Sequence, residues 1–147
     1  MFDELYQEIL MDHYRHPRNA ADLSHIPDSR IHENPTCGDA IKIEITSVNE
    51  MVTSIQHETY GCAISTASAS LMSEYLKGKN VFQVQEEIIK FLKIMRGELP
   101  TDNLDTFEDL VCLAGVAKLP VRLKCATLAW HALLDCILHL VSGVTLP

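Results

Sequence analysis

Residues 39–47 read DAIKIEITS, and this stretch decides the fold. Its three isoleucines, Ile41, Ile43 and Ile45, alternate with polar residues, a pattern typical of a half-buried β-strand. Asn49-Glu50 can then turn the chain, so we expect residues 51–60 to form the partner strand. The sequence therefore predicts a small antiparallel sheet with one apolar face that other elements must cover.

Helical patterns supply that cover. Apolar residues at helical spacing, or runs of small residues, predict helices at 2–15, 63–77, 81–96, 106–117 and about 121–140. The segments 18–36 and 100–105 are polar and are expected to be mostly loop. The order of elements predicts an α+β fold, in which a small antiparallel sheet packs against several α-helices.

Length and composition limit the classes of protein. A chain of 147 residues with 47% hydrophobic residues fits one domain, 1–147. Twenty acidic residues against twelve basic ones give a net charge of -8, which argues against nucleic-acid binding and against a polybasic membrane anchor. The first residues lack the basic and apolar regions of a signal peptide, so we expect a cytoplasmic protein with reduced thiols.

The apolar stretch 125–147 is expected to be a core helix and not a membrane span. Its helical spacing collects polar residues on one stripe, namely Lys124, His131, Asp135 and His139.

Three of the five cysteines lie at the boundaries of expected elements: Cys37 before the first strand, Cys62 after the second, and Cys125 early in the last helix. Asp39 is two residues from Cys37, and across Gly38 both side chains could reach one ion. Three thiolates and one carboxylate match the four ligands of tetrahedral zinc, and soft thiolates also suit iron–sulfur sites. Because the chain has no C-x-x-C pair, the spacing leaves a second possibility open, that these cysteines are small core residues.

The other candidates have simpler expected roles. Cys112 and Cys136 lie within apolar helical runs and are expected in the core. His13 is expected at the end of the first helix, where a cationic side chain suits the helix dipole. His32 is the one histidine that could reach the ion, but we expect a simple loop residue. Arg122 would add positive potential near Cys125.

Four segments, taken in order, resemble the iron–sulfur cluster assembly family that includes IscU, SufU and the N-terminal domain of NifU. They are DHYRHPRN at 12–19, NPTCGD at 34–39, GCAISTASAS at 61–70 and LPVRLKCA at 119–126. The resemblance covers most of the chain and implies the α+β fold of that family, with a small antiparallel sheet of about three strands packed against several α-helices.

Two features are similar to the SufU branch. IscU-type proteins carry a histidine immediately before the last ligand cysteine, where this chain has Lys124. The stretch 97–118 also looks like the extra segment of SufU-type proteins. The resemblance implies a zinc-dependent sulfurtransferase that binds one zinc ion through Cys37, Asp39, Cys62 and Cys125.

The same resemblance implies a partner and a role for two residues. A SufS-type cysteine desulfurase, using its own pyridoxal phosphate, would form a persulfide, and Cys37 would accept the outer sulfur. Arg122 could contact the partner or the developing thiolate. The sulfur would then pass to an iron–sulfur scaffold or apo-acceptor protein.

Two alternatives stay open at the level of sequence. The same four residues could hold a transient [2Fe–2S] cluster on a scaffold protein, because cysteine-rich sites serve both zinc and iron–sulfur. The site could also be a purely structural zinc module, although the carboxylate disfavours this.

Overall fold

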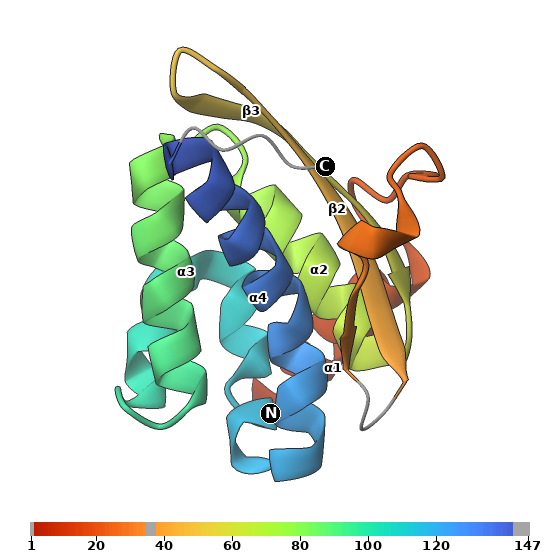
Figure 1. The fold of residues 1–147 in the computed structure, drawn as a ribbon. Coiled ribbons are helices and arrows are strands. Elements are labelled where there is room, and N and C mark those ends of the chain that lie inside the picture. Colours follow the sequence, from red (N-terminus) through yellow and green to blue (C-terminus); the bar gives the residue numbers. More distant parts are fainter. Residues whose placement is uncertain (1, 35–37, 143–147) are drawn as a thin grey trace.

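The computed structural model describes residues 2–34 and 38–142, and its sheet has the expected hairpin at its centre. Strands β1 (His32–Asn34), β2 (Asp39–Val48) and β3 (Met51–Tyr60) form an antiparallel sheet in that order (Figure 1). The β2–β3 turn places Asn49 and Glu50 at φ values of 52° and 68°, as a tight two-residue hairpin loop requires. The expected strands are confirmed, and the third strand, β1, lies within the stretch that we expected to be mostly loop.

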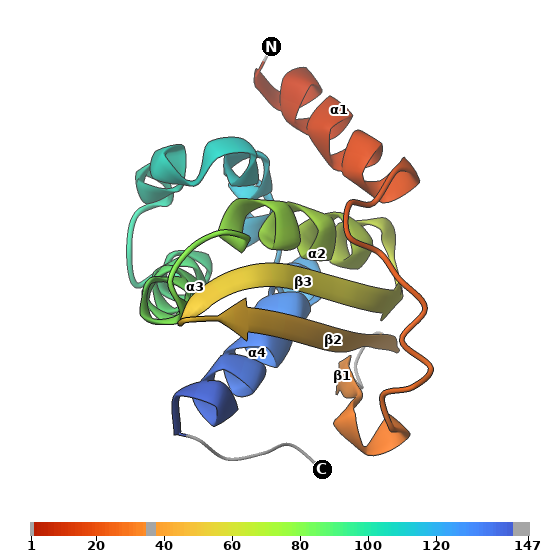
Figure 2. The ribbon, with the colours of Figure 1, turned by 90° about the horizontal axis from the view of Figure 1, so that it is seen from above.

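Four α-helices confirm four of the five expected helices, and they cover one face of the sheet. They are α1 (Phe2–Arg15), α2 (Ala63–Leu76), α3 (Val81–Met95) and α4 (Pro120–Ser142). Helix α2 packs over β3 and α4 packs over β1 and β2, while α3 lies against α4 and α1 lies against α2 (Figures 1 and 2). The α+β fold is therefore a small sheet under a layer of helices.

The prediction of a fifth α-helix at 106–117 was wrong, and so was the prediction of a polar linker at 100–105. The structure has 3₁₀ turns at Thr101–Leu113 and Val116–Lys118, with a break at Glu108, whose φ is 55°. Four of the five buried residues of Thr101–Leu113 recur at every third position, which suits the three-residue turn of a 3₁₀ helix. They are Leu104, Phe107, Leu110 and Leu113, and the fifth is Cys112.

Helix α4 is the one helix among the described residues that is long and apolar enough to cross a membrane, over Pro120–Leu140. In this structure 56% of an apolar 18-residue part of that stretch is buried, and the helix packs against the sheet and the neighbouring helices. Its expected role as a core helix is confirmed by this packing.

An aromatic stack lies at the centre of the helical layer. The rings of Phe91 and Trp130 lie 3.8 Å apart at their centroids and 13° from parallel. The Trp130 indole N–H donates to Ser68 Oγ at 3.0 Å, and the Ser68 hydroxyl donates to the Ala126 carbonyl at 2.6 Å. The small residues of α2 thus let α4 approach closely and still satisfy the indole N–H.

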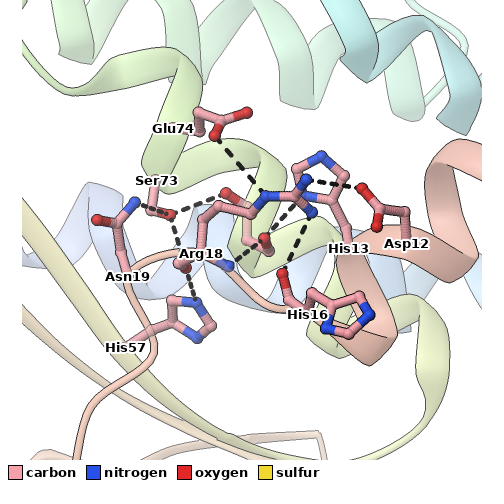
Figure 3. Close-up of polar contacts among 9 residues, drawn as sticks. Asp12, His13, His16, Arg18, Asn19, His57, Ser73 and Glu74 are labelled. Carbon is pink, nitrogen blue, oxygen red and sulfur yellow. Dashed lines mark hydrogen bonds and ion pairs between the residues drawn. The ribbon is translucent and has the colours of Figure 1, made fainter.

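The outer edge of β3 is covered by the chain that follows α1. The Ala21 N–H donates to the His57 carbonyl at 2.9 Å, and the His57 N–H donates to the Asn19 carbonyl at 3.1 Å. The His57 ring donates from Nε2 to the Arg18 carbonyl at 2.9 Å (Figure 3), and its Nδ1 lies 2.9 Å from the Thr59 hydroxyl. Burial lowers the pKa of His57, which favours the neutral ring.

His13 corrects our expectation of a cationic residue at the helix end. It is 2% exposed, and its Nδ1 lies 2.7 Å from the Ser70 hydroxyl, which also accepts the Arg18 backbone N–H at 2.8 Å. Burial, with repulsion from Arg18, lowers the pKa of His13. The Arg18 guanidinium instead pairs with Asp12 at 2.6 Å (Figure 3). The DHYRHPRN segment therefore fastens α1 to α2.

The aromatic stack gives a test of the core. We expect Phe91→Ala to lower the free energy of unfolding by about 3–5 kcal/mol, because it leaves a cavity beside Trp130. Phe82 lies on the same helix but is 48% exposed, so Phe82→Ala should change stability by less than about 0.5 kcal/mol. Urea unfolding measures both, and equal losses would contradict this account of the core.

The buried histidines give a test by pH. Burial lowers the pKa of His57, opposed in part by its bond to the Arg18 carbonyl, and the pKa of His13 is lowered as well. The unfolded chain therefore binds more protons than the folded chain below about pH 6.5, and the stability should fall as the pH falls through that range. His57→Gln keeps a donor for the Arg18 carbonyl but does not titrate. It should reduce this slope by up to about 1.4 kcal/mol per pH unit, and an unchanged slope in urea titrations would refute the assignment.

Candidate metal centre

Three of the four residues implied as ligands come together at one end of the sheet. Asp39 begins β2, Cys62 is the N-cap of α2, and Cys125 lies in the second turn of α4. One ligand atom from each lies within 4.8 Å of the other two. Asp39 and Cys125 are buried and Cys62 is half-buried, so the cluster has one accessible side. Among the described residues, this is the one group of His, Cys, Asp or Glu side chains close enough to hold a metal ion.

The Asp39 carboxylate is held from the first turn of α2. Its Oδ1 accepts the backbone N–H of Cys62 at 3.1 Å, and its Oδ2 accepts the hydroxyl of Ser65. The N-terminal N–H groups of a helix have no partner within the helix, and α2 has no capping side chain of its own. A carboxylate from β2 therefore caps α2, and the negative charge suits the helix dipole.

Gly61 makes room for this carboxylate. A Cβ atom at Gly61 would lie 2.6 Å from Asp39 Cγ, closer than atoms can approach without displacement. Glycine is therefore required here by the packing of Asp39, whereas no atom lies within 4 Å of a Cβ built at Gly115.

The donor set fits zinc. Two thiols and one carboxylate are common zinc ligands, and tetrahedral geometry at ordinary zinc distances separates a sulfur from an oxygen by roughly 3.5 Å. Cys62 Sγ lies 3.8 Å from Asp39 Oδ2. The three described side chains could thus hold one zinc ion with small shifts, and a tetrahedral site needs one further ligand.

The surroundings of Cys62 act in opposite directions on its thiol. Burial, and repulsion from Asp39, oppose ionisation, whereas hydrogen bonds from Ser65 and Cys125 favour it. The net effect lowers the pKa of Cys62 below its usual value. Cys62 is the N-cap of α2, a position at which the helix dipole also favours a thiolate.

The other candidate residues, Cys37, Arg122 and His32, do not belong to the three-residue cluster that the structure describes. Cys37 lies outside the described residues, so its expected roles as ligand and sulfur acceptor stay predictions. Arg122 is exposed on the first turn of α4. His32 belongs to β1, not to a loop, and pairs with Asp135 at 3.0 Å, away from the three-residue cluster.

Cys112 and Cys136 are core residues, as expected. They are 3% and 5% exposed, and burial raises the pKa of Cys112 to about 12 and raises that of Cys136 as well.

Two residues of the site were missed by sequence reasoning. Ser65 is 2% exposed and reaches both Asp39 and Cys62, and Gly61 makes space for Asp39. Ser65 follows the N-cap by three residues, a spacing that places side chains near the cap, and this signal could have identified it.

The chain is similar to known proteins over most of its length. Residues 5–140 match the model of the NifU-like N terminal domain. The zinc-dependent sulfurtransferase SufU of Bacillus subtilis is 41% identical over 133 residues, 89% of this chain and 88% of the relative. The iron–sulfur cluster assembly scaffold protein IscU of Streptococcus pyogenes is 33% identical over 92% of this chain and 84% of its own length. A crystal structure of a SUF-system scaffold protein from Fervidobacterium islandicum is similar at a TM-score of 0.68 and 25% identity, over 88% of this chain and 94% of that one.

The chain belongs to the NifU-like N-terminal domain family, a family of iron–sulfur cluster assembly proteins. Within that family it is similar to SufU, which agrees with Lys124 and with the segment 97–118.

The glycine at the site gives a direct test of this geometry. Gly61→Ala should displace the Asp39 carboxylate and lower the free energy of unfolding by about 1–3 kcal/mol. The matched control is Gly115→Ala. The added Cβ atom would lie in open space, and the φ of -68° at Gly115 suits alanine, so stability should be unchanged or slightly higher. If thermal unfolding shows both substitutions to be neutral, Asp39 is not packed against Gly61.

Proposed function

We propose that this chain is a zinc-dependent sulfur acceptor that takes persulfide sulfur from a SufS-type cysteine desulfurase in the cytoplasm and passes it on for iron–sulfur cluster assembly. The observation that carries the proposal is the convergence of Asp39, Cys62 and Cys125 from three separate elements. The similarity to a zinc-dependent sulfurtransferase over most of the chain supports it.

The proposed ligands of one zinc ion are Cys37, Asp39, Cys62 and Cys125. When bound, zinc would keep the coordinating thiols deprotonated at neutral pH. Asp39 is a harder ligand than the three thiolates, and a mixed set of this kind suits a site at which one ligand can leave.

Cys37 is the proposed acceptor. Cys125 is 1% exposed, and Cys62 is held at the start of α2 by Ser65, so neither is as suited to meet a partner protein. The Cys37 thiolate would attack the outer sulfur of the persulfide of the desulfurase. A sulfur–sulfur bond forms on Cys37 as that of the partner breaks, and the partner cysteine leaves as a thiolate. No oxidant or reductant is consumed.

Arg122 is proposed to assist the partner complex. It is exposed three residues before the buried Cys125, so it lies about one turn away on α4. In a chain of net charge -8, this local positive charge would attract the anionic persulfide group or an acidic patch of the partner.

A scaffold role is the second candidate, because the IscU scaffold proteins are also similar to this chain. In that role, the same donors would hold a [2Fe–2S] cluster as cargo for transfer to an apo-acceptor. Lys124, where IscU-type proteins have histidine, favours the sulfur-acceptor role. Anaerobic reconstitution with iron and sulfide separates the two candidates, since a stable cluster that transfers to an apo-acceptor would support the scaffold role.

The main test mixes the zinc-loaded protein with a SufS-type desulfurase and cysteine. We expect faster release of alanine, because the persulfide is removed from the desulfurase, and we expect the Cys37 peptide to gain the mass of one sulfur atom. Alanine release and peptide mass spectrometry measure the two effects.

The matched variants are Cys37→Ala and Cys136→Ala. The first should abolish both effects, whereas the second changes a core cysteine that is 5% exposed and should keep both. A persulfide on the Cys37→Ala variant, or no persulfide on the folded zinc-loaded protein, would refute Cys37 as the acceptor.

A further inference from the structure

We propose that Ser65 is a positioning residue for the metal centre, because its hydroxyl group holds the Asp39 carboxylate beside Cys62. The hydroxyl donates to Asp39 Oδ2, and Ser65 Oγ lies 3.5 Å from Cys62 Sγ. This inference rests on the proposed function, since it concerns the residues that would hold the zinc ion.

The hydrogen-bond roles follow from the number of protons available. A serine hydroxyl has one proton, and the carboxylate is the strongest acceptor in reach. The Ser65 oxygen, 3.5 Å from Cys62 Sγ, can accept from the Cys62 thiol only while that thiol keeps its proton, so in the zinc-bound state the bond to Asp39 is the one that remains. Together with the bond from the Cys62 N–H to Asp39 Oδ1, this closes a ring of contacts between Asp39, Cys62 and Ser65.

The ring fixes the two donors relative to each other. Asp39 belongs to β2 and Cys62 precedes α2, so without Ser65 only the Cys62 N–H would tie the carboxylate to the helix. Ser65 is 2% exposed, so water does not compete for its hydroxyl. Both carboxylate oxygens are then held in place, each with a second lone pair left for an ion.

This arrangement predicts a role in holding the ion during sulfur transfer. If Cys37 is released from the ion to accept sulfur, as the proposed function requires, Asp39, Cys62 and Cys125 would be left to hold the ion. Residues that orient metal ligands typically change affinity by roughly 10–100-fold when they are removed. Ser65 should therefore be needed for tight binding, although it is not itself a ligand.

The experiment compares three substitutions in the full chain. Ser65→Ala removes the hydroxyl, Ser65→Thr keeps it, and Thr66→Ala removes a hydroxyl from the next, half-buried residue. Zinc affinity is measured by competition with a chromogenic chelator, and the absorption bands of the cobalt(II)-substituted proteins report the geometry of the donors. Urea unfolding of the metal-free proteins measures stability separately.

We expect zinc to bind Ser65→Ala roughly 10–100-fold more weakly, with shifted cobalt bands, and to bind Ser65→Thr and Thr66→Ala nearly as tightly as the parent. A parental zinc affinity and cobalt spectrum for Ser65→Ala would overturn the proposal, whatever its stability. If Ser65→Ala does not fold, the test rests on Ser65→Thr, which keeps the hydroxyl. A complete loss of zinc binding by folded Ser65→Thr would also overturn the proposal. Failure of the parent protein to bind zinc at all would instead refute the proposed function.

Discussion

The burial of the Asp39 carboxylate is the constraint on which the site depends. A charged group that is 2% exposed must be hydrogen-bonded, because an unsatisfied buried charge is strongly destabilising. Its two oxygens are satisfied by the N–H of Cys62 and the hydroxyl of Ser65. The start of β2 is thereby joined to the start of α2, and the thiol of Cys62 is brought within reach of the carboxylate.

The packing of the helices places α4, which carries Cys125, beside the contact between β2 and α2. Helix α4 approaches α2 closely because α2 presents small residues, and Ser68 bonds both to Trp130 and to the Ala126 carbonyl. Ala126 directly follows Cys125, so the same contact fixes the depth at which the Cys125 thiol enters the cluster. The aromatic core and the metal centre are therefore parts of one packing arrangement, and a change in the α2–α4 contact should affect both.

Local patterns were sufficient to predict most of the fold. The alternation of Ile41, Ile43 and Ile45 and the turn at Asn49-Glu50 gave the hairpin, and helical spacing gave the four α-helices. The failures have physical reasons. Strand β1 has three residues, too few to show a period, and it forms because it pairs with β2. The segment after α3 repeats its apolar residues every third position, which we took for an α-helix.

The site was predictable in part. Asp39, Cys62 and Cys125 were singled out from their positions, and the resemblance to a known family implied the proposed set of four ligands. Local spacing gives no account of which side chains meet across elements, so the bond from Ser65 to Asp39 and the close approach of Gly61 were missed. For the same reason His13 was expected to be cationic, since its partner Ser70 is 57 residues away in sequence.

The most direct test of the account is zinc K-edge X-ray absorption on the purified, zinc-loaded protein. The account predicts a four-coordinate ion with three sulfur ligands and one oxygen ligand, from Cys37, Cys62, Cys125 and Asp39. In the Asp39→Ala variant, the spectrum should lose the contribution of the carboxylate oxygen to the zinc ligand shell, and the protein should bind zinc more weakly. A site made of nitrogen and oxygen ligands alone, or a parent spectrum that the Asp39 substitution leaves unchanged, would contradict it.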